Sequence, residues 1–173
     1  MRIRTIGQRR SGTTLVESAI VLGLFLMFLM GIFEYGRYLM MIHVSTNAAR
    51  GGVRYATVNV DKPDDFDTTP ITISGITYLS INDYTKSQMG GVQDMMIGCT
   101  VTVFPVDASQ MYSDPPVIAA KSSYTSWKQA TFTERIAVQI TGTYKPILPV
   151  FVFFYASDGT IPISITACSG SEG

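Results

Sequence analysis

The chain has 173 residues, a length typical of a single domain, and its 13 basic and 13 acidic side chains cancel. The charges are unevenly placed, because residues 1–12 hold four arginines and no acid, which leaves 9 basic and 13 acidic groups on the remainder. A basic head is typical of the cytoplasmic side of a membrane. The mildly acidic remainder excludes the electrostatic footprint of a nucleic-acid-binding protein.

A strongly apolar segment follows the basic head and carries no charge over the 16 residues from Ser18 to Phe33. As a helix these residues reach roughly 24 Å, short of a hydrocarbon core of ~30 Å. Counted from Thr13, the helix has 21 residues and reaches roughly 31 Å. A comfortable span therefore includes Glu17, and an acid inside a membrane is a functional-site hypothesis by default. The alternative places Glu17 among the headgroups, where the helix dipole favours an anion.

Three interpretations of this N-terminus compete. One is a cleaved secretory signal, whose apolar region is ~7–15 residues long, and another is a twin-arginine export signal containing Arg9-Arg10. The third is a retained single-pass anchor. The apolar run continues into EYGRYLMMIHV without a small-residue cleavage site, and its flanking charge places the N-terminus in the cytoplasm. We therefore expect an anchor with an extracytoplasmic C-terminal domain.

Helical periodicity continues beyond the apolar run and predicts one long helix from about Thr13 to Arg50 or Ala56. Glu34 and Arg37 lie one turn apart and are expected to pair at the membrane edge. The apolar stripe is expected to pack against the chain's own C-terminal domain or against neighbouring subunits. It consists of Tyr35, Leu39, Ile42, Thr46, Ala49, Val53 and Ala56.

Glycine and polar residues divide the rest of the chain. Gly51-Gly52 predicts an end or a kink of the long helix, and the Asp-, Thr- and Pro-rich residues 59–75 predict a loop. A short helix is expected over Ser80–Met89, with Ser80 as its cap. Residues 107–133 form a long polar connection. The very apolar residues 146–155 fit either the core or a loop tip that touches membrane or a partner.

Three segments alternate as strands, with one apolar and one polar face each. The fold class is therefore α+β, a long N-terminal transmembrane and amphipathic helix packed on a small three-stranded antiparallel sheet. We divide the chain into a basic leader (1–12), a long helix (13–56) with a membrane span (13–33) and a stalk (34–56), and an extracytoplasmic α+β domain (57–173). The strands are Cys99–Val106, Arg135–Tyr144 and Ile161–Cys168.

The sequence contains no recognisable catalytic or metal-binding pattern. Its one histidine, His43, lies on the polar face of the helix, and there is no histidine or cysteine pair at ligand spacing and no glycine-rich phosphate loop. We predict no enzyme, no cofactor or metal, and neither a small-molecule substrate nor a nucleic-acid partner. A disulfide between Cys99 and Cys168 is permitted outside the cytoplasm. Strand parity argues against it, because Cys99 shares the predicted buried face and Cys168 the predicted wet face.

The residues around Glu17 carry the most specific pattern. RRSG is followed by TTLVE and then by the hydrophobic run. This order resembles the processing site of type IV prepilins, where a glycine precedes the cut and a glutamate is the fifth mature residue. The resemblance implies cleavage by a prepilin peptidase between Gly12 and Thr13. It also implies that Glu17 offsets the α-ammonium of an adjacent subunit, in a medium where an unpaired charge is costly.

A longer stretch, from Gly12 to Ala56, resembles the TadE-like family, pilin-like proteins of the tight-adherence (Flp) pilus system. The phrases LVESAIVL, GIFEYGR and NAARGGVRYA carry the likeness, and ITGTYKPILP adds a weaker one. The resemblance implies a pilin-like fold and a minor pilin-like protein (a pseudopilin) of pilus assembly, adhesion or secretion in the bacterial inner membrane. The implied partners are other pilin-like subunits, the assembly machinery, the prepilin peptidase and membrane lipid. Ser18 stands where the major pilins usually have tyrosine, which indicates a subunit other than the main one of the fibre.

Two alternatives to this function stay open. One is an uncleaved single-pass membrane protein with an extracytoplasmic interaction domain. The other is a secreted enzyme or ligand-binding module behind an ordinary signal peptide. The three functions differ in the expected N-terminal residue, which is Thr13, Met1 or a residue beyond about 34.

Overall fold

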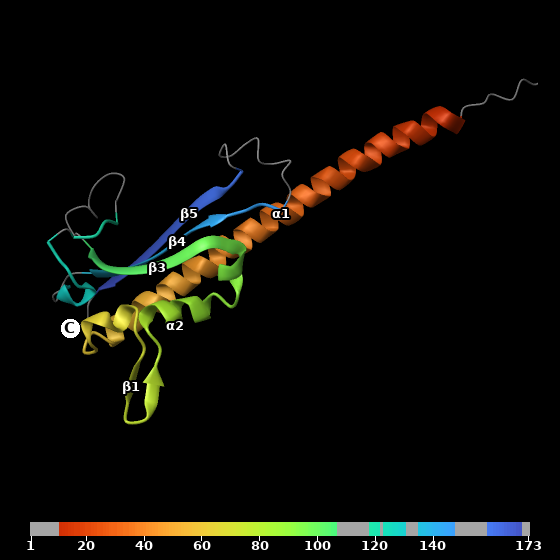
Figure 1. The fold of residues 1–173 in the computed structure, drawn as a ribbon. Helices are drawn as coiled ribbons and strands as arrows, with labels where there is room; N and C mark the ends of the chain where they lie inside the picture. The colour runs from red at the N-terminus through yellow and green to blue at the C-terminus, as the bar shows by residue number, and fades with distance from the viewer. Residues whose placement is uncertain (1–10, 107–117, 122, 131–134, 148–158, 171–173) are drawn as a thin grey trace, which may run out of the picture.

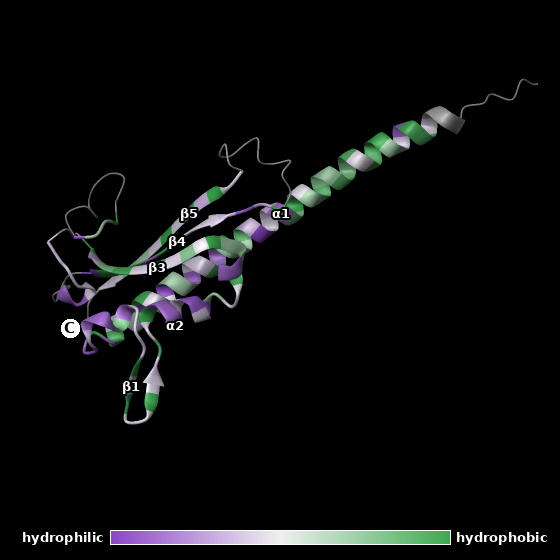
Figure 2. Cartoon of the chain, in the orientation of Figure 1, coloured by the Kyte–Doolittle hydropathy of each residue, from purple (hydrophilic) through white to green (hydrophobic). Residues whose placement is uncertain are grey.

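The helix α1 (Ser11–Val58) has 48 residues and organises the structure. The structure is a computed structural model that describes residues 11–106, 118–121, 123–130, 135–147 and 159–170, without the side chains of residues 11–13. Figure 1 shows the N-terminal half of α1 projecting beyond the rest of the fold and its C-terminal half lying along the sheet. The projecting half is almost uniformly hydrophobic (Figure 2) and exposed. Within the described part of the chain, α1 is the one helix long and apolar enough to cross a membrane.

The helix α1 continues through the glycine pair to Val58, so the expected helix end at Gly51-Gly52 is wrong. Both residues lie inside α1, at the place where α1 packs against the helix α2 (Ile81–Gln88). A Cβ added at Gly52 would overlap the hydroxyl of Thr85 and lie 3.3 Å from the Cβ of Thr85. The glycine therefore permits close approach of two helices rather than ending one.

The helix α2 confirms the predicted short helix and its cap. The hydroxyl of Ser80 accepts a hydrogen bond from the backbone N–H of Asp83 at 3.0 Å, which satisfies a donor that the first helical turn leaves free. Gly90 and Gly91 follow with φ values of 56° and 89°, a conformation that glycine adopts without steric cost. The 3-10 helix η2 (Val92–Met95) then leads into the sheet.

The sheet consists of β3 (Met96–Val106), β4 (Arg135–Tyr144) and β5 (Ile161–Gly170), in the order β3-β4-β5 and antiparallel throughout. The three predicted strands and the α+β fold class are thereby confirmed. Val101 pairs with Ile140 across β3 and β4, and Ile140 pairs with Ile165 across β4 and β5. The register shifts between Ile97 and Thr100, where Gly98 has φ 66°.

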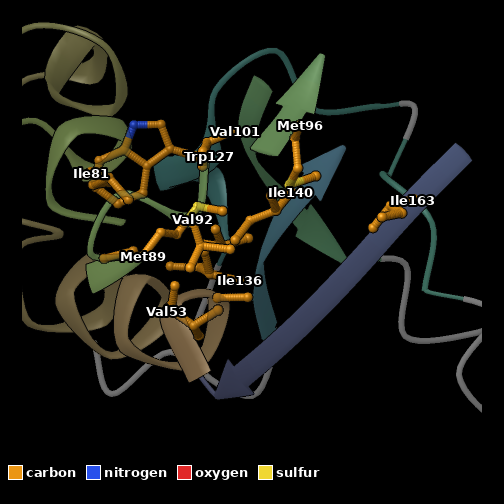
Figure 3. Packing of buried hydrophobic residues seen from close by; sticks show 14 of the residues in the cluster. Val53, Ile81, Met89, Val92, Met96, Val101, Trp127, Ile136, Ile140 and Ile163 are labelled. Atoms are coloured by element: carbon orange, nitrogen blue, oxygen red, sulfur yellow. The ribbon is translucent and has the colours of Figure 1, made fainter. Parts of the chain in front are cut away.

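One face of this sheet is covered by the C-terminal half of α1, which contacts β4 and β5. The predicted apolar face of β4 contributes three buried residues, Ile136, Val138 and Ile140, because alternate residues of a strand point to the same side. Helix α2 and the 3-10 helix η4 (Trp127–Gln129) complete the core. Figure 3 shows the side chains that meet between these elements, among them Val53, Ile81, Met89, Val101, Trp127, Ile136 and Ile140.

The predicted apolar stripe of α1 is shifted in the structure. Tyr35 is 60% exposed and does not pack in the core of its own chain, while Ala49, Val53 and Ala56 are buried as expected. Packing of Tyr35 against a neighbouring subunit stays a prediction. The domain joins α1 along a neighbouring set of positions, because the sheet lies against a slightly rotated face of the helix. The buried residues of that face are Met41, Ser45, Ala48, Ala49, Val53 and Ala56.

A small hairpin replaces part of the predicted loop over residues 59–75. The 3-10 helix η1 (Asp64–Asp67) is followed by β1 (Ile71–Ile73) and β2 (Ile76–Tyr78), which pair antiparallel. Ser74 and Gly75 form the turn with φ values of 52° and 81°, the positive values that a tight hairpin needs. The hairpin projects from the body of the fold (Figure 1). Of the apolar segment 146–155, only residues 146–147 are described, so its predicted placement lies outside the described residues.

Candidate functional site

The predicted processing site lies at the far end of α1. The helix begins at Ser11, so the backbone of Gly12 and Thr13 belongs to its first turn. Glu17 follows one turn later, on the exposed part of the helix. Glu17 shares a shallow surface of α1 with Val21, Leu22 and Phe25, so the carboxylate sits at one end of an apolar strip.

Glu34, the next acid along α1, lies in a contrasting environment. It follows the charge-free run directly, about 26 Å along the helix axis from Glu17 at ~1.5 Å per residue. Unlike Glu17, Glu34 is buried, with a side-chain exposure of 11%. The carboxylate of Glu34 lies where the projecting half of α1 meets the sheet.

Three groups donate hydrogen bonds to the Glu34 carboxylate. The hydroxyl of Tyr144, the last residue of β4, donates to Oε1, and the backbone N–H of Ile147 donates to the same oxygen at 3.3 Å. Arg37 donates to both oxygens from Nη1 at 3.4 Å. The structure thus contains an ion pair between Glu34 and Arg37, while its position at a membrane edge stays a prediction. We call Glu34, Arg37 and Tyr144 the junction cluster.

Sequence reasoning missed two members of this arrangement. Tyr144 and Ile147 are 110 and 113 positions away from Glu34, so no local spacing pointed to them. A signal was nevertheless present, since Tyr144 ends a predicted strand whose apolar face is covered by the same helix. A tyrosine at the end of such a strand has an apolar body for the core and a hydroxyl that needs a partner.

The junction cluster keeps the Tyr144 phenol in its neutral form. Burial of the phenol, the hydrogen bond to Glu34 and the negative charge of Glu34 together raise the pKa of Tyr144 to about 12, against the smaller opposing effect of Arg37. The ring of Tyr38 meets the Tyr144 ring edge-on at 5.7 Å, and the Arg37 guanidinium lies 5.9 Å from the centroid of the Tyr144 ring. At neutral pH the cluster therefore serves to hold β4 on α1, and Tyr144 acts as a hydrogen-bond donor.

A cavity of about 360 Å³ adjoins the junction cluster. Residues of α1 form one wall, and the ends of β4 and β5 with Pro146 form the other. The lining residues are Gly31, Glu34, Tyr35, Tyr38, Tyr144, Pro146 and Ile161. The lining is therefore mainly apolar and aromatic, with one carboxylate.

The two cysteines are free thiols in the structure. Cys168 pairs with Ala137 on β4, whereas Cys99 precedes Thr100, which pairs with Thr141. The cysteines are therefore separated by the whole of β4 and by about four residues along the strands, or roughly 16 Å at normal sheet spacings. A disulfide needs Cα atoms roughly 4.4–6.8 Å apart, so distance opposes the bridge more firmly than strand parity does.

The remaining titratable side chains do not form a metal site. His43 is exposed on the polar face of α1. Across the described residues, histidine, cysteine and acidic side chains nowhere gather in a group of three or more that could hold a metal ion.

These features define an α+β protein in which one N-terminal helix, exposed and apolar in its first half, is continuous with the helix that covers the sheet. Residues 12–54 match the model of a family described as TadE-like protein, which confirms the resemblance over about a quarter of the chain. The match begins at Gly12, in the predicted processing site, and includes Glu34 and Arg37, the two members of the junction cluster that lie on α1. No curated protein and no solved structure matches the chain. Proteins of the TadE-like family are structural components of the tight-adherence pilus system, so the match implies involvement in pilus assembly.

Proposed function

We propose that this protein is a membrane-anchored pseudopilin of a tight-adherence pilus assembly or secretion machine, with α1 as its single membrane span. The observation that carries the proposal is the exposed, apolar first half of α1, which contains Glu17 and lies inside the stretch that matches the TadE-like family. An exposed apolar surface of this length is stable only when lipid or other subunits cover it. The basic residues 1–12 favour a cytoplasmic N-terminus in the bacterial inner membrane.

In this function the chain is cut by a prepilin peptidase between Gly12 and Thr13. The cut creates an α-ammonium at Thr13 and makes Glu17 the fifth residue of the mature chain. An ionised carboxylate within the hydrocarbon is costly alone, so a neighbouring subunit's α-ammonium stabilises it and favours lateral assembly. The protein partners of the mature chain are then other pilin-like subunits and the assembly machinery.

The mass of the mature N-terminal peptide tests the processing step. We expect Thr13 as the first residue in cells that contain a prepilin peptidase and Met1 in cells that lack it. Gly12→Leu is the matched variant, and it should block the cut because a branched side chain obstructs the backbone that the peptidase must reach. Met1 in all conditions would support the uncleaved anchor, and a start beyond about residue 34 would support a signal peptide.

Glu17→Ala tests the assembly step. We expect the variant protein to be folded, membrane-bound and processed but poorly assembled, as measured by the amount of pilus on the cell surface. Glu17→Asp keeps the charge and should retain most of the assembly, and Ser18→Ala is a neutral control beside it. Normal piliation by Glu17→Ala would contradict the role given to this carboxylate.

A further inference from the structure

The cavity at the junction cluster adjoins a shallow apolar groove on the exposed half of α1. The groove is lined by Met27, Phe28, Gly31, Ile32 and Tyr35, and it shares Gly31 and Tyr35 with the cavity. From Met27 to Tyr35 the groove follows the helix for about 12 Å. The cavity has a polar end at Glu34 and the adjoining groove is apolar, so together they match an amphiphile with a headgroup and an acyl chain.

The cavity offers a negative charge among aromatic rings. Glu34 Oε1 accepts the hydrogen bonds from Tyr144 and Ile147, whereas Oε2 is contacted by Arg37 at 3.4 Å. That distance exceeds the roughly 2.7–2.9 Å of a strong charge-assisted bond, so Oε2 keeps capacity to accept from a ligand. The rings of Tyr35, Tyr38 and Tyr144 line the same space, and aromatic faces attract cations. These groups suit an ammonium ion.

Arg37 lies one helical turn beyond Glu34 and contacts Glu34 and the Tyr144 ring, but it does not line the cavity. The charged group of the lining is the Glu34 carboxylate, which favours a headgroup with a cationic end over one with a net negative charge. A primary ammonium also donates three hydrogen bonds, whereas the quaternary ammonium of a choline headgroup donates none.

We propose that the junction cavity binds the headgroup of an aminophospholipid of the phosphatidylethanolamine type, with its ammonium at Glu34 and an acyl chain in the groove below. The cavity has room for about a dozen waters at roughly 30 Å³ each, which is sufficient for a headgroup of this size. The proposal rests on the membrane anchoring proposed above, because only a membrane-inserted α1 brings the groove into contact with lipid.

Native mass spectrometry of the full chain in detergent tests the proposal. The protein is mixed with equal amounts of phosphatidylethanolamine, phosphatidylcholine and phosphatidylglycerol that carry the same acyl chains. We expect phosphatidylethanolamine to be retained about tenfold more than either competitor, the ratio expected for one extra charge-assisted hydrogen bond. Equal retention of the three lipids, or preference for the anionic one, would overturn the proposal.

Three variants assign the preference to the cavity. Glu34→Gln keeps an acceptor for Tyr144 but removes the charge, so the preference should fall to a ratio near one, and Glu17→Gln at the other end of the run should leave it unchanged. Tyr35→Ala alters an exposed wall shared by cavity and groove, and it should reduce lipid retention without affecting folding. An unchanged preference in Glu34→Gln, or unchanged lipid retention in Tyr35→Ala, would overturn the proposal.

The outcome is distinguishable from a failure of the proposed function. Loss of phosphatidylethanolamine preference in a protein that is membrane-inserted and starts at Thr13 would reject the lipid site alone. A protein that is not membrane-inserted would reject the anchoring itself.

Discussion

Glu17 and Glu34 are two carboxylates on one helix whose charges are accommodated in different ways. Glu34 is buried and receives hydrogen bonds from a hydroxyl, a backbone N–H and a guanidinium of its own chain. Glu17 lies on the exposed, apolar half of α1. The fold thus supplies hydrogen-bond donors to Glu34 from its own chain, and the proposed function gives Glu17 its partner in another subunit.

Replacement of Tyr144 by phenylalanine tests how much the buried contact to Glu34 stabilises the fold. The change removes the hydroxyl that donates to a buried carboxylate, so we expect the free energy of unfolding to fall by about 2 kcal/mol. Urea unfolding in detergent, followed by the fluorescence of the sole tryptophan, Trp127, provides the measurement. Tyr35→Phe, at an exposed ring, is the matched control and should change stability by less than about 0.5 kcal/mol. Equal effects of the two changes would contradict the assignment.

The same contact predicts a loss of stability at alkaline pH. In the unfolded chain Tyr144 ionises near its ordinary pKa of 10.0, whereas in the folded chain its pKa is about 12. The folded state thus favours the protonated phenol, and this stabilisation is complete below pH 10 and is lost as the pH rises toward 12. The stability difference between the wild type and Tyr144→Phe should therefore shrink over this window. A constant difference would show that the phenol is not held protonated by folding.

The contacts of Glu34 could be predicted only in part from the sequence. The Glu34–Arg37 pair was predictable because three positions along a helix bring side chains to the same face. Tyr144 was not, because its approach to Glu34 depends on how the sheet docks on the helix. The exposure of Tyr35 within its own chain could not be predicted for the same reason, since periodicity defines a stripe on a helix and only the docked sheet determines which of its residues are covered.

The contact between α1 and α2 gives the clearest element-scale feature. Gly51 and Gly52 have the same helical backbone but different neighbours, since a Cβ at Gly51 would lie 3.7 Å from Gln88 Cγ in ordinary contact. At Gly52 the neighbour is Thr85, which is fixed by its own hydrogen bond to the carbonyl of Ile81 at 2.7 Å. At Gly51, helix propensity favours alanine and the packing accommodates it. At Gly52, helix propensity favours alanine but the packing against Thr85 opposes it.

We therefore expect opposite effects from two alanine substitutions. Gly51→Ala should stabilise the protein by about 0.5–1 kcal/mol, because alanine loses less backbone entropy in a helix. Gly52→Ala should destabilise it by about 1–3 kcal/mol, because the added methyl group forces the helices apart. Urea unfolding of both variants provides the measurement, and adding Thr85→Ala to Gly52→Ala should restore part of the loss. A Gly52→Ala variant as stable as Gly51→Ala would contradict the close approach.

Sequence patterns predicted most of the secondary structure. The strands β3, β4 and β5 alternate clearly over about eight or more residues, and α2 carries its own cap at Ser80. The hairpin β1–β2 was missed because its strands have only 3 residues each and lie within a segment whose Asp, Thr and Pro content predicts a loop. Its Ser74-Gly75 turn was the one local signal that pointed to it.

At the scale of the whole molecule, the fold keeps apart the two cysteines, which composition alone would allow to form a disulfide. The two cysteines are far apart on the sheet, and burial raises the pKa of the Cys99 thiol, with a smaller opposing effect from Lys86. Strand parity argued against a bridge, but the distance that opposes it could be derived only from the strand order and register.

Alkylation of the full chain tests this arrangement. After unfolding without a reductant, mass spectrometry should find two modified cysteines per chain, since both are free thiols. In the folded protein Cys99 should react more slowly than it does after unfolding, because less of the half-buried thiol is ionised. No modification without a reductant would contradict the strand order found here.

Because α1 is one continuous helix, a tilt of its first half also tilts the domain attached to its second half. Val58 lies 25 residues beyond Phe33, or about 37 Å along the helix axis. In a bilayer, a tilt of about 20°, the average for membrane-spanning helices, moves Val58 sideways by about 13 Å. Because the sheet is fixed to α1 at the junction cluster and along the buried face, the sheet turns with the helix. Any change in the tilt of α1 therefore changes the direction in which the distal end of the domain points.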